Sequence, residues 1–498
     1  MKRLEAKCVV PVNREALFAY HNSPGALQRL IPPWESVELE SSDYSLEPGS
    51  KVVLKMKLGP FALRWVAVHG DFDPPNRFED RQQSGPFAYW HHRHLFCEGS
   101  ESQVDDSLGN ESSEPRSGLN LAGENRQQPV ATLVDSIDYR LPLGKIGDFF
   151  GRRSIQRQLA AMFRYRHQVT KDDLMLFEKY PRRPLAVAVS GATGLVGTEL
   201  CGLLNLAGHG VIRLVRDASD ATPGTGPIVD APAPNKGDTH AVAPWAINGQ
   251  AARLDGVDVV IHLAGKSIAD KRWTEDIKRE IRDSRVVKTR QLCESLAKLN
   301  RPPKTLLCAS AIGIYGDRGE EWMDEGSPHA DDFLGDVATQ WEEACRPAIE
   351  AGIRVVNLRF GIILSPRGGA LQKMLTPMKM GVGGRLGSGK QWWSWIGIDD
   401  VIGAIYHCMM TPEIEGPVNL VAPNPATNLE FTKTLGSVLN RPTLIPAPAT
   451  GLRIALGEMA DALLLASTRV KPQVLLKSGY EFRHTDLRSC LQHLLGRQ

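Results

Sequence analysis

The stretch LAVAVSGATGLVGTEL, residues 185–200, decides the fold of most of this chain. Its first five residues are apolar, as in a parallel strand that is buried on both faces. A helical pattern begins at Leu195, so the glycines at 191, 194 and 197 fall between a strand and a helix. Glycine turns in this position present backbone N–H groups to a phosphate. The stretch therefore predicts a nucleotide-binding βαβ unit over about 184–265.

Each glycine of this turn has an expected task. Gly191 lets the chain turn tightly, Gly194 lets the backbone approach a pyrophosphate, and Gly197 lets the helix pack close to the strand. We expect the dinucleotide to contact Gly191, Thr193, Gly194, Leu195, Val196 and Gly197. The alternative interpretation is a glycine turn that serves only strand–helix packing.

The end of the next strand bears on the choice of cofactor. It reads Arg213-Leu214-Val215-Arg216, whereas an NAD site usually carries an acid here for the ribose hydroxyls. The guanidinium of Arg216 can instead pair with a 2′-phosphate. Arg216 therefore favours NADP(H), but Asp217 follows directly, and a solvated arginine is the alternative.

Apolar strands and helices alternate after a proline-containing linker at 179–184. Strands are expected at 185–190, 211–215, 257–263, 305–309 and 353–360, and helices at 195–207, 274–298 and 333–350. This alternation predicts an α/β Rossmann fold, a doubly wound parallel sheet covered on both faces.

The first 180 residues follow a different pattern. Strands are expected at 51–58, 64–69, 88–96 and 131–139, and a helix from about 148 to 177, which predicts an α+β unit. Residues 98–129 are poor in apolar side chains and are expected to form a flexible insertion. Residues 218–243, rich in Pro, Gly and Ala, are expected to form a loop.

Composition excludes several classes of protein. The 498 residues include 59 basic and 57 acidic side chains. This near balance of charge gives no electrostatic argument for nucleic-acid binding. No apolar run is long enough for a membrane span. The eight cysteines form no CxxC motif, which favours reduced thiols and a cytoplasmic location.

Three histidines lie close together at 91, 92 and 94. On a strand, His92 and His94 share a face and His91 lies on the other. Because no third ligand is evident, we interpret them as half-exposed strand residues and expect no metal.

Further motifs resemble the extended short-chain dehydrogenases/reductases, and within them an atypical epimerase-family branch often labelled nucleoside-diphosphate-sugar epimerase. The resemblance covers about 185–440, and residues 444–482 are similar to a short domain of unknown function that follows this branch. The motifs are GATGLVG (191–197), LVR (214–216), HLAG (262–265), IKREIRDSRVVKTRQL (277–292), SAIGIYGDRGE (310–320), LRFGIILSPRGGAL (358–371) and GGRLGSGKQWWSWIGIDD (383–400).

The resemblance implies further cofactor contacts. Val215 and Arg216 would meet the adenosine phosphate end, and Ile363 the nicotinamide half. The remaining implied contacts are Leu263, Ala264, Glu280 and Arg285. Without the resemblance, Glu280 and Arg285 would be read as a solvated pair on a helix.

The usual proton-transfer residues of this superfamily are missing. Its members typically use a Tyr-x-x-x-Lys pair with a Ser, in which the Lys lowers the tyrosine pKa. Leu334 and Ala338 occupy the Tyr and Lys positions here. Ser310 remains at a strand end, and Tyr315 is the best surviving phenol, either as a proton donor or as a packing tyrosine.

The segment from Gly387 to Trp395 is a glycine turn that leads into three tryptophans. Lys390 could meet a substrate anion, and the tryptophans could wall a pocket. The alternative is that the tryptophans belong to the core. Gly397 stands where relatives tend to carry histidine after Trp-Ile, which weakens an acid–base role there.

Residues 1–180 resemble the helix-grip cyclase/START-like (SRPBCC) superfamily, best over 134–174. The resemblance implies an apolar ligand between a curved sheet and a long helix, although fold alone does not establish function. We thus expect domains at 1–180 (helix-grip), 181–440 (NADP-binding Rossmann) and 441–498 (small and helical).

Three functions fit these patterns. The first is an NADP(H)-dependent oxidoreductase or epimerase that acts on a small molecule, since the cofactor carries the reaction. The second is a non-catalytic NADP(H)-binding sensor or assembly protein, as the missing Tyr/Lys pair suggests. The third is a two-step enzyme whose first domain presents an apolar substrate to the second.

The substitution Arg216→Ala tests the choice between cofactors. It should weaken NADPH binding much more than NADH binding, because only NADPH carries the 2′-phosphate. Titrating both nucleotides against wild type and variant measures the difference. Equal losses would remove the NADP assignment.

Overall fold

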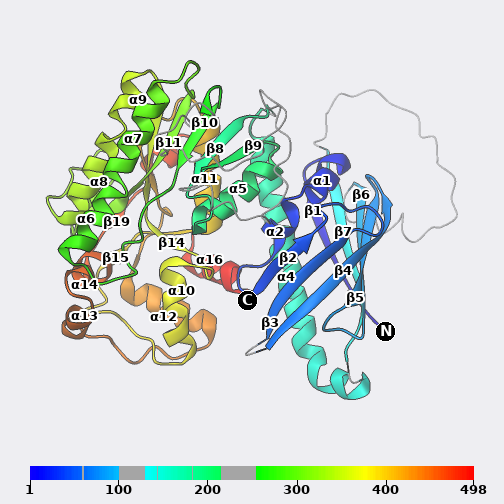
Figure 1. Ribbon diagram of the computed structural model, residues 1–498. Coiled ribbons are helices and arrows are strands. Elements are labelled where there is room, and N and C mark those ends of the chain that lie inside the picture. The colour runs from blue at the N-terminus through cyan, green and yellow to red at the C-terminus, as the bar shows by residue number, and fades with distance from the viewer. Residues whose placement is uncertain (59–60, 100–128, 143, 182, 215–253, 498) are drawn as a thin grey trace, which may run out of the picture. The chain divides into compact units, whose positions relative to one another are not determined.

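The computed structural model describes residues 1–58, 61–99, 129–142, 144–181, 183–214 and 254–497. Residues up to 181 form one compact unit and those from 183 a second (Figure 1). Val215, Arg216, Asp217 and the predicted loop at 218–243 lie outside the described residues, as does the expected insertion apart from its ends.

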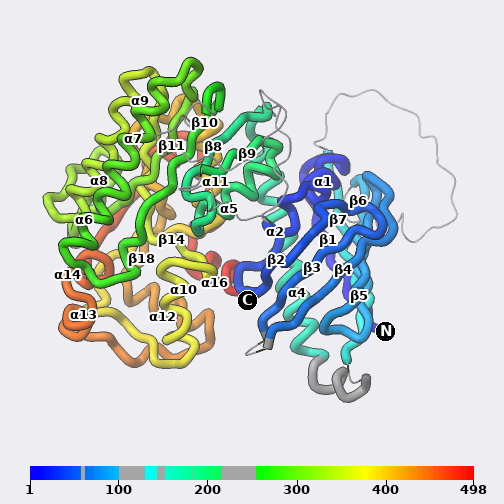
Figure 2. Tube along the Cα trace, in the orientation of Figure 1, coloured from blue at the N-terminus to red at the C-terminus, as the bar shows by residue number. Residues whose placement is uncertain are grey.

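The first unit contains a seven-stranded antiparallel sheet in the order β1-β7-β6-β5-β4-β3-β2. Strands β1 and β7, far apart in sequence, run side by side (Figure 2). The four predicted strands correspond to β3, β4, β6 and β7, but β1, β2 and β5 were not predicted. The strands are β1 Lys2–Val10, β2 Val37–Ser42, β3 Lys51–Leu58, β4 Phe61–Asp73, β5 Arg77–Ser84, β6 Tyr89–Glu98 and β7 Ala131–Arg140.

A long helix, α4 (Gly144–Glu178), ends the first unit and confirms the helix predicted there. Leu159 and Phe163 of α4 share a core cluster with Trp90, Ile137 and Tyr139 of the sheet. The structure thus shows an antiparallel sheet packed against a final helix, whereas the helix-grip family assignment rests on sequence resemblance alone.

The expectation of half-exposed histidines on β6 is wrong. His91, His92 and His94 are 9%, 4% and 3% exposed. Helix α4 causes part of this burial, because the ring of its Phe163 contacts that of His92. The alternation of side chains along a strand indicates which residues share a face, but it does not indicate what covers that face.

A buried ion pair ties the short helices α1 (Arg14–Asn22) and α2 (Ala26–Leu30) to α4. Arg29 of α2 donates from Nε and Nη2 to the two carboxylate oxygens of Asp173, at 3.0 and 3.1 Å. Tyr20 of α1 donates to the same carboxylate at 2.9 Å. The Arg29 and Asp173 side chains are only 1% and 0% exposed, so each charge depends on the other.

The substitution Arg29→Ala should destabilise the first unit by about 3–5 kcal/mol, because it removes the guanidinium charge that offsets the buried carboxylate of Asp173. A matched control is Arg64→Ala, because the side chains of the Arg64–Glu40 ion pair are exposed (60% and 42%). Its loss should lower the free energy of unfolding by about 0–1 kcal/mol. Urea unfolding followed by circular dichroism measures both. Similar losses for the two variants would contradict this role of the buried pair.

The second unit contains a six-stranded parallel sheet in the order β17-β13-β11-β10-β8-β9, which confirms the predicted Rossmann-like sheet. The chain order reverses between β8 and β10, and ligands of such sheets bind at the carboxyl ends of the strands beside this point. The strands are β8 Ala186–Ser190, β9 Gly210–Leu214, β10 Val259–His262, β11 Thr305–Ala311, β13 Arg354–Phe360 and β17 Gly416–Leu420.

Helices cover both faces of this sheet (Figure 1). Helices α5 (Leu195–Leu206) and α11 (Ile398–Met410) contact each other on one face. On the other, side chains of α7 (Val286–Ala297), α8 (Phe333–Glu343) and α9 (Arg346–Glu350) join a core cluster with β10 and β11.

Two predicted helices are each divided in two. The segment 274–298 forms α6 (Glu275–Asp283) and α7. The break lies at Ser284 and Arg285, where Ser284 accepts a hydrogen bond from the backbone of Lys266 and Arg285 donates to the Lys266 carbonyl. The segment 333–350 forms α8 and α9, with Pro347 in the first turn of α9.

The described residues after 440 belong to the second unit. The eight cysteines are free, and seven of them are buried. Among the described residues, no helix is long and apolar enough to span a membrane. The remaining elements of this unit are β12 Trp322–Met323, β14 Ile362–Leu364, α10 Gly369–Lys379, β15 Trp392–Trp393, β16 Trp395–Gly397, β18 Ala426–Thr427, α12 Asn428–Leu439, α13 Ala449–Leu456, α14 Glu458–Ala460, β19 Arg469–Val470, α15 Gln473–Lys477 and α16 Leu487–Leu495, with short helical turns at Ile312–Tyr315 and Asp461–Leu465.

Candidate nucleotide and substrate site

The glycine turn between β8 and α5 is packed too closely for side chains. Gly191 has a φ of +69°, and a Cβ there would lie 2.9 Å from the carbonyl carbon of Leu263. A Cβ on Gly197 would lie 2.1 Å from the Gly191 carbonyl oxygen. Gly194 caps α5 without a side-chain hydrogen bond. The start of α5 therefore has the uncapped N-terminus that an anion site requires.

A buried hydrogen-bond chain holds β8 and β10 together beside this turn. Ser190 Oγ lies 2.6 Å from Nδ1 of His262, and His262 Nε2 lies 3.1 Å from Oγ1 of Thr289. Burial lowers the pKa of His262 to about 4, so its ring is neutral near pH 7. Ser190 Oγ also accepts from the backbone N–H groups of Leu263 and Ala264. Sequence analysis missed this chain, although Ser190 ends one predicted strand and His262 is the second-last residue of another.

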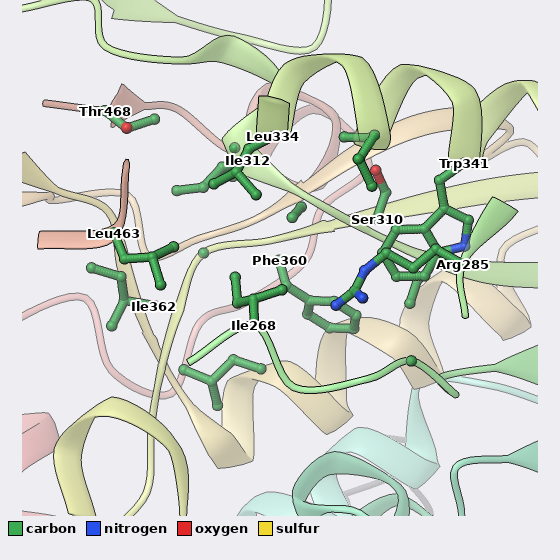
Figure 3. A pocket seen from close by; sticks show the side chains of 18 of the residues that line it. Ile268, Arg285, Ser310, Ile312, Leu334, Trp341, Phe360, Ile362, Leu463 and Thr468 are labelled. Atoms are coloured by element: carbon green, nitrogen blue, oxygen red, sulfur yellow. The ribbon is translucent and has the colours of Figure 1, made fainter. Parts of the chain in front are cut away.

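A cavity of about 430 Å³ extends from the turn along the carboxyl ends of the strands (Figure 3). Its walls are mostly apolar, as in many sites for cofactors and small molecules. The predicted contacts Gly191, Gly194, Leu195, Val196, Gly197, Leu263, Arg285, Ser310 and Ile363 all line it. Thr193, Ala264, Glu280 and Tyr315 are not among its lining residues.

Arg285 places a half-buried cation in the cavity wall. Its guanidinium donates to the carbonyl oxygens of Ile281 at 3.1 Å and Lys266 at 2.9 Å, and lies 5.0 Å from the ring centre of Trp341 (Figure 3). Burial lowers its pKa to about 10, and no described acid forms an ion pair with it. Arg285 therefore carries a charge that an anionic ligand could neutralise.

Glu280 has a different environment. It forms an ion pair with Lys266, and its side chain is 53% exposed. No ion pair joins it to Arg285 among the described residues, so the alternative interpretation of Glu280 and Arg285 as a solvated pair is not what the structure shows.

Ser310 ends a hydrogen-bond network that runs behind the cavity wall. Its hydroxyl donates to Oε1 of Glu342 at 2.7 Å. Arg359 donates to both oxygens of Glu342, each at 2.8 Å, and to the Tyr315 hydroxyl at 2.8 Å. The bidentate pair fixes Glu342, and Glu342 in turn orients Ser310.

Tyr315 lies within this network rather than at the cavity. Its side chain is fully buried, and its hydroxyl donates to Oδ1 of Asn419 at 2.8 Å. Burial raises the pKa of Tyr315 to about 12. These contacts are those of a packing tyrosine, the alternative to a proton donor.

Leu334 and Ala338 of α8 both line the cavity. The resemblance places the superfamily's Tyr and Lys at these two positions, so both positions face the cavity here but present only apolar groups. Among the described lining residues, Ser310 is the hydroxyl at the end of a central strand, so a proton route through Ser310, water or the substrate itself fits this cavity.

The C-terminal residues and the tryptophans complete the cavity. Trp392 and Trp393 line it, as do Leu463 and Thr468, whereas Trp395 is fully buried. The guanidinium of Arg469 lies between the rings of Trp392 and Trp322, 3.9 and 4.1 Å from their centres. These cation–π contacts hold Trp392 in the wall.

The predicted substrate residue Lys390 is exposed and is not among the lining residues. A Cβ on Gly397 would lie 2.9 Å from the Cys490 sulfur of α16, so the space of a histidine side chain is occupied.

Known proteins resemble both the second unit and the whole chain. Residues 187–420 match the model of the NAD dependent epimerase/dehydratase family, and residues 447–494 match a domain of unknown function, DUF1731. Epimerase family protein YfhF of Bacillus subtilis is 38% identical over 312 residues, 62% of this chain and 97% of the relative.

Two solved structures extend the comparison. A nucleoside-diphosphate sugar epimerase from Corynebacterium glutamicum is 30% identical with a TM-score of 0.74, and the match covers 99% of this chain and 90% of the other. Human epimerase family protein SDR39U1 (isoform 2), solved with NADPH, is 32% identical with a TM-score of 0.55, over 62% of this chain and 98% of the other. On this evidence, the chain belongs to the NAD dependent epimerase/dehydratase family.

Proposed function

We propose that the second unit is an NADP(H)-dependent oxidoreductase or epimerase that acts on a small, largely apolar molecule. The observation that carries this proposal is the cavity of about 430 Å³, which joins the glycine turn to Ser310 between apolar walls. NADP(H) would supply or accept the hydride, and the protein contributes mainly placement.

Four observations support NADP(H) as the cofactor. The uncapped start of α5 suits the pyrophosphate, and the half-buried cation of Arg285 suits an anionic group of the nucleotide. Arg216 suits the 2′-phosphate from sequence alone. The human relative, at 32% identity, was solved with NADPH.

The chain's own residues would act by orientation and by excluding water. Leu334, Ala338 and Ile363 present apolar groups to the cavity. The Ser310 hydroxyl, held by Glu342 at 2.7 Å, can turn to bind an oxygen of the substrate. Water or a group of the substrate would deliver the proton that the missing tyrosine delivers in other members.

A second candidate function is a non-catalytic NADP(H) sensor or assembly protein. The specific observation in its favour is that Leu334 and Ala338 face the cavity where a proton-transfer pair would stand. Such a protein would bind the nucleotide tightly and leave it unchanged.

We further propose that the first unit is a helix-grip domain that binds an apolar ligand. Its antiparallel sheet and the packing of Leu159 and Phe163 from α4 against that sheet support this assignment.

The substitution Gly197→Ala tests the nucleotide site. The new methyl would clash with the Gly191 carbonyl and force α5 from the turn, so the Kd for NADPH should rise at least about tenfold, the equivalent of about 1.4 kcal/mol. Gly202→Ala on the same helix is the matched control, since nothing lies within 4 Å of its Cβ position. Fluorescence titration with NADPH measures both. Unchanged binding by Gly197→Ala would argue against a pyrophosphate at this turn.

A turnover assay separates the two functions. Panels of carbonyl compounds and sugar nucleotides are incubated with the protein and cofactor. NADPH absorbance reports net reduction, and chromatography of the products reports epimerisation, which leaves the cofactor unchanged overall. For any substrate found, Ser310→Ala should lower kcat by about 10²-fold without changing the Kd for NADPH. Ser295→Ala, which removes an exposed hydroxyl on α7, is the control. Tight NADPH binding with no turnover across the panels would favour the sensor.

A further inference from the structure

Five polar side chains meet on the helix-covered face of the first unit's sheet. The register pairs Asp80 of β5 with His92 of β6, and His94 of β6 with Asp135 of β7. His167 of α4 completes the group, 2.6 Å from Asp135 Oδ2. All except Asp80 are at most 9% exposed. Buried groups of this kind are found where charges pair with one another or coordinate a metal ion.

Three of these side chains have the arrangement of metal ligands. Each of the three offers one ligand atom, and these atoms all lie within 4.8 Å of one another; the residues are Asp80, His92 and His94. Oδ2 of Asp80 is 3.4 Å from Nδ1 of His92, and the rings of His92 and His94 have centroids 3.9 Å apart. Ligand atoms about 2.0–2.1 Å from a tetrahedral zinc ion are roughly 3.3 Å apart, so small adjustments would suffice.

His94 is 3% exposed, and its Nδ1 lies 2.6 Å from Asp135 Oδ1. Asp135 therefore contacts both histidines of the cluster, and its carboxylate can orient the ring of His94 as well as that of His92.

Asp135 has the position of an orienting carboxylate. Its Oδ1 is 3.0 Å from Nε2 of His92, while Nδ1 of His92 faces Asp80. Metal-bound histidines usually donate their second N–H to a carboxylate in this way. His92 thus has one nitrogen for Asp135 and the other for a metal.

We propose that Asp80, His92 and His94 bind one Zn²⁺ ion, with Asp135 as a positioning residue behind the histidines. Two imidazoles and a carboxylate are ligands that Zn²⁺ accepts, and three protein ligands leave a fourth position for water or a ligand. The site lies wholly within the first unit and is independent of the nucleotide site.

His91 offers an internal control on the same strand. It points to the opposite face of β6, where its Nε2 lies 2.7 Å from Glu79 Oε2. Replacing His91 removes a buried imidazole of the same strand without touching the proposed ligands.

The test measures zinc in untagged full-length protein that has been loaded with Zn²⁺ and dialysed. Mass spectrometry of the metal should find one ion per chain in wild type and His91→Gln, and at least about tenfold less in His92→Gln and His94→Gln. Asp135→Asn should weaken zinc affinity about 10–100-fold in a chelator competition. Equal zinc in wild type, His91→Gln and His94→Gln would overturn the proposal, because surface groups would then hold the metal.

A measurement on wild type keeps the test decisive if a variant fails to fold, which circular dichroism would reveal. Co²⁺ in place of Zn²⁺ should give the intense visible bands of a tetrahedral site, and Zn²⁺ should abolish them. A wild-type protein that retains no Zn²⁺ and shows no such Co²⁺ spectrum would refute the site.

Discussion

The close approach of backbone to backbone at the glycine turn is the constraint on which the second unit depends. The Gly191 carbonyl has no room for a Cβ on Gly197, and Gly191 itself lies against the chain that follows β10. This contact fixes where α5 begins relative to the parallel sheet. The position of α5 in turn sets one end of the cavity, so the nucleotide site is a consequence of packing as much as of its individual residues.

Two polar networks support the cavity in different ways. The chain from Ser190 through His262 to Thr289 is neutral and fixes the strand ends. The network of Ser310, Glu342 and Arg359 is charged, and its bidentate ion pair holds a hydroxyl at the cavity wall. A neutral network tolerates burial at little cost, whereas a charged one must be complete. The wall that would meet substrate is therefore more sensitive to change than the strand ends behind it.

The sequence predicted the features that depend on local pattern. The buried strands of the second unit are continuous apolar runs, so their alternation with helices was evident. Strand β5 was missed because only Phe78 of its eight residues is buried. The helix break at Arg285 and the burial of Tyr315 depend on Lys266 and Arg359, which are distant in sequence. The environment of His92 and His94 depends likewise on Asp80, Asp135 and α4. Sequence spacing cannot reveal such long-range partners.

The C-terminal residues have an unexpected share in the cavity. Leu463 and Thr468 line it, and the guanidinium of Arg469 packs between the rings of Trp392 and Trp322. The short domain after residue 440 is thus no detachable appendage, because it closes a wall that the Rossmann core leaves open. Exchanging this domain between relatives would exchange part of the cavity wall. Substrate preference in the family should therefore depend on the C-terminal residues as well as on the Rossmann core.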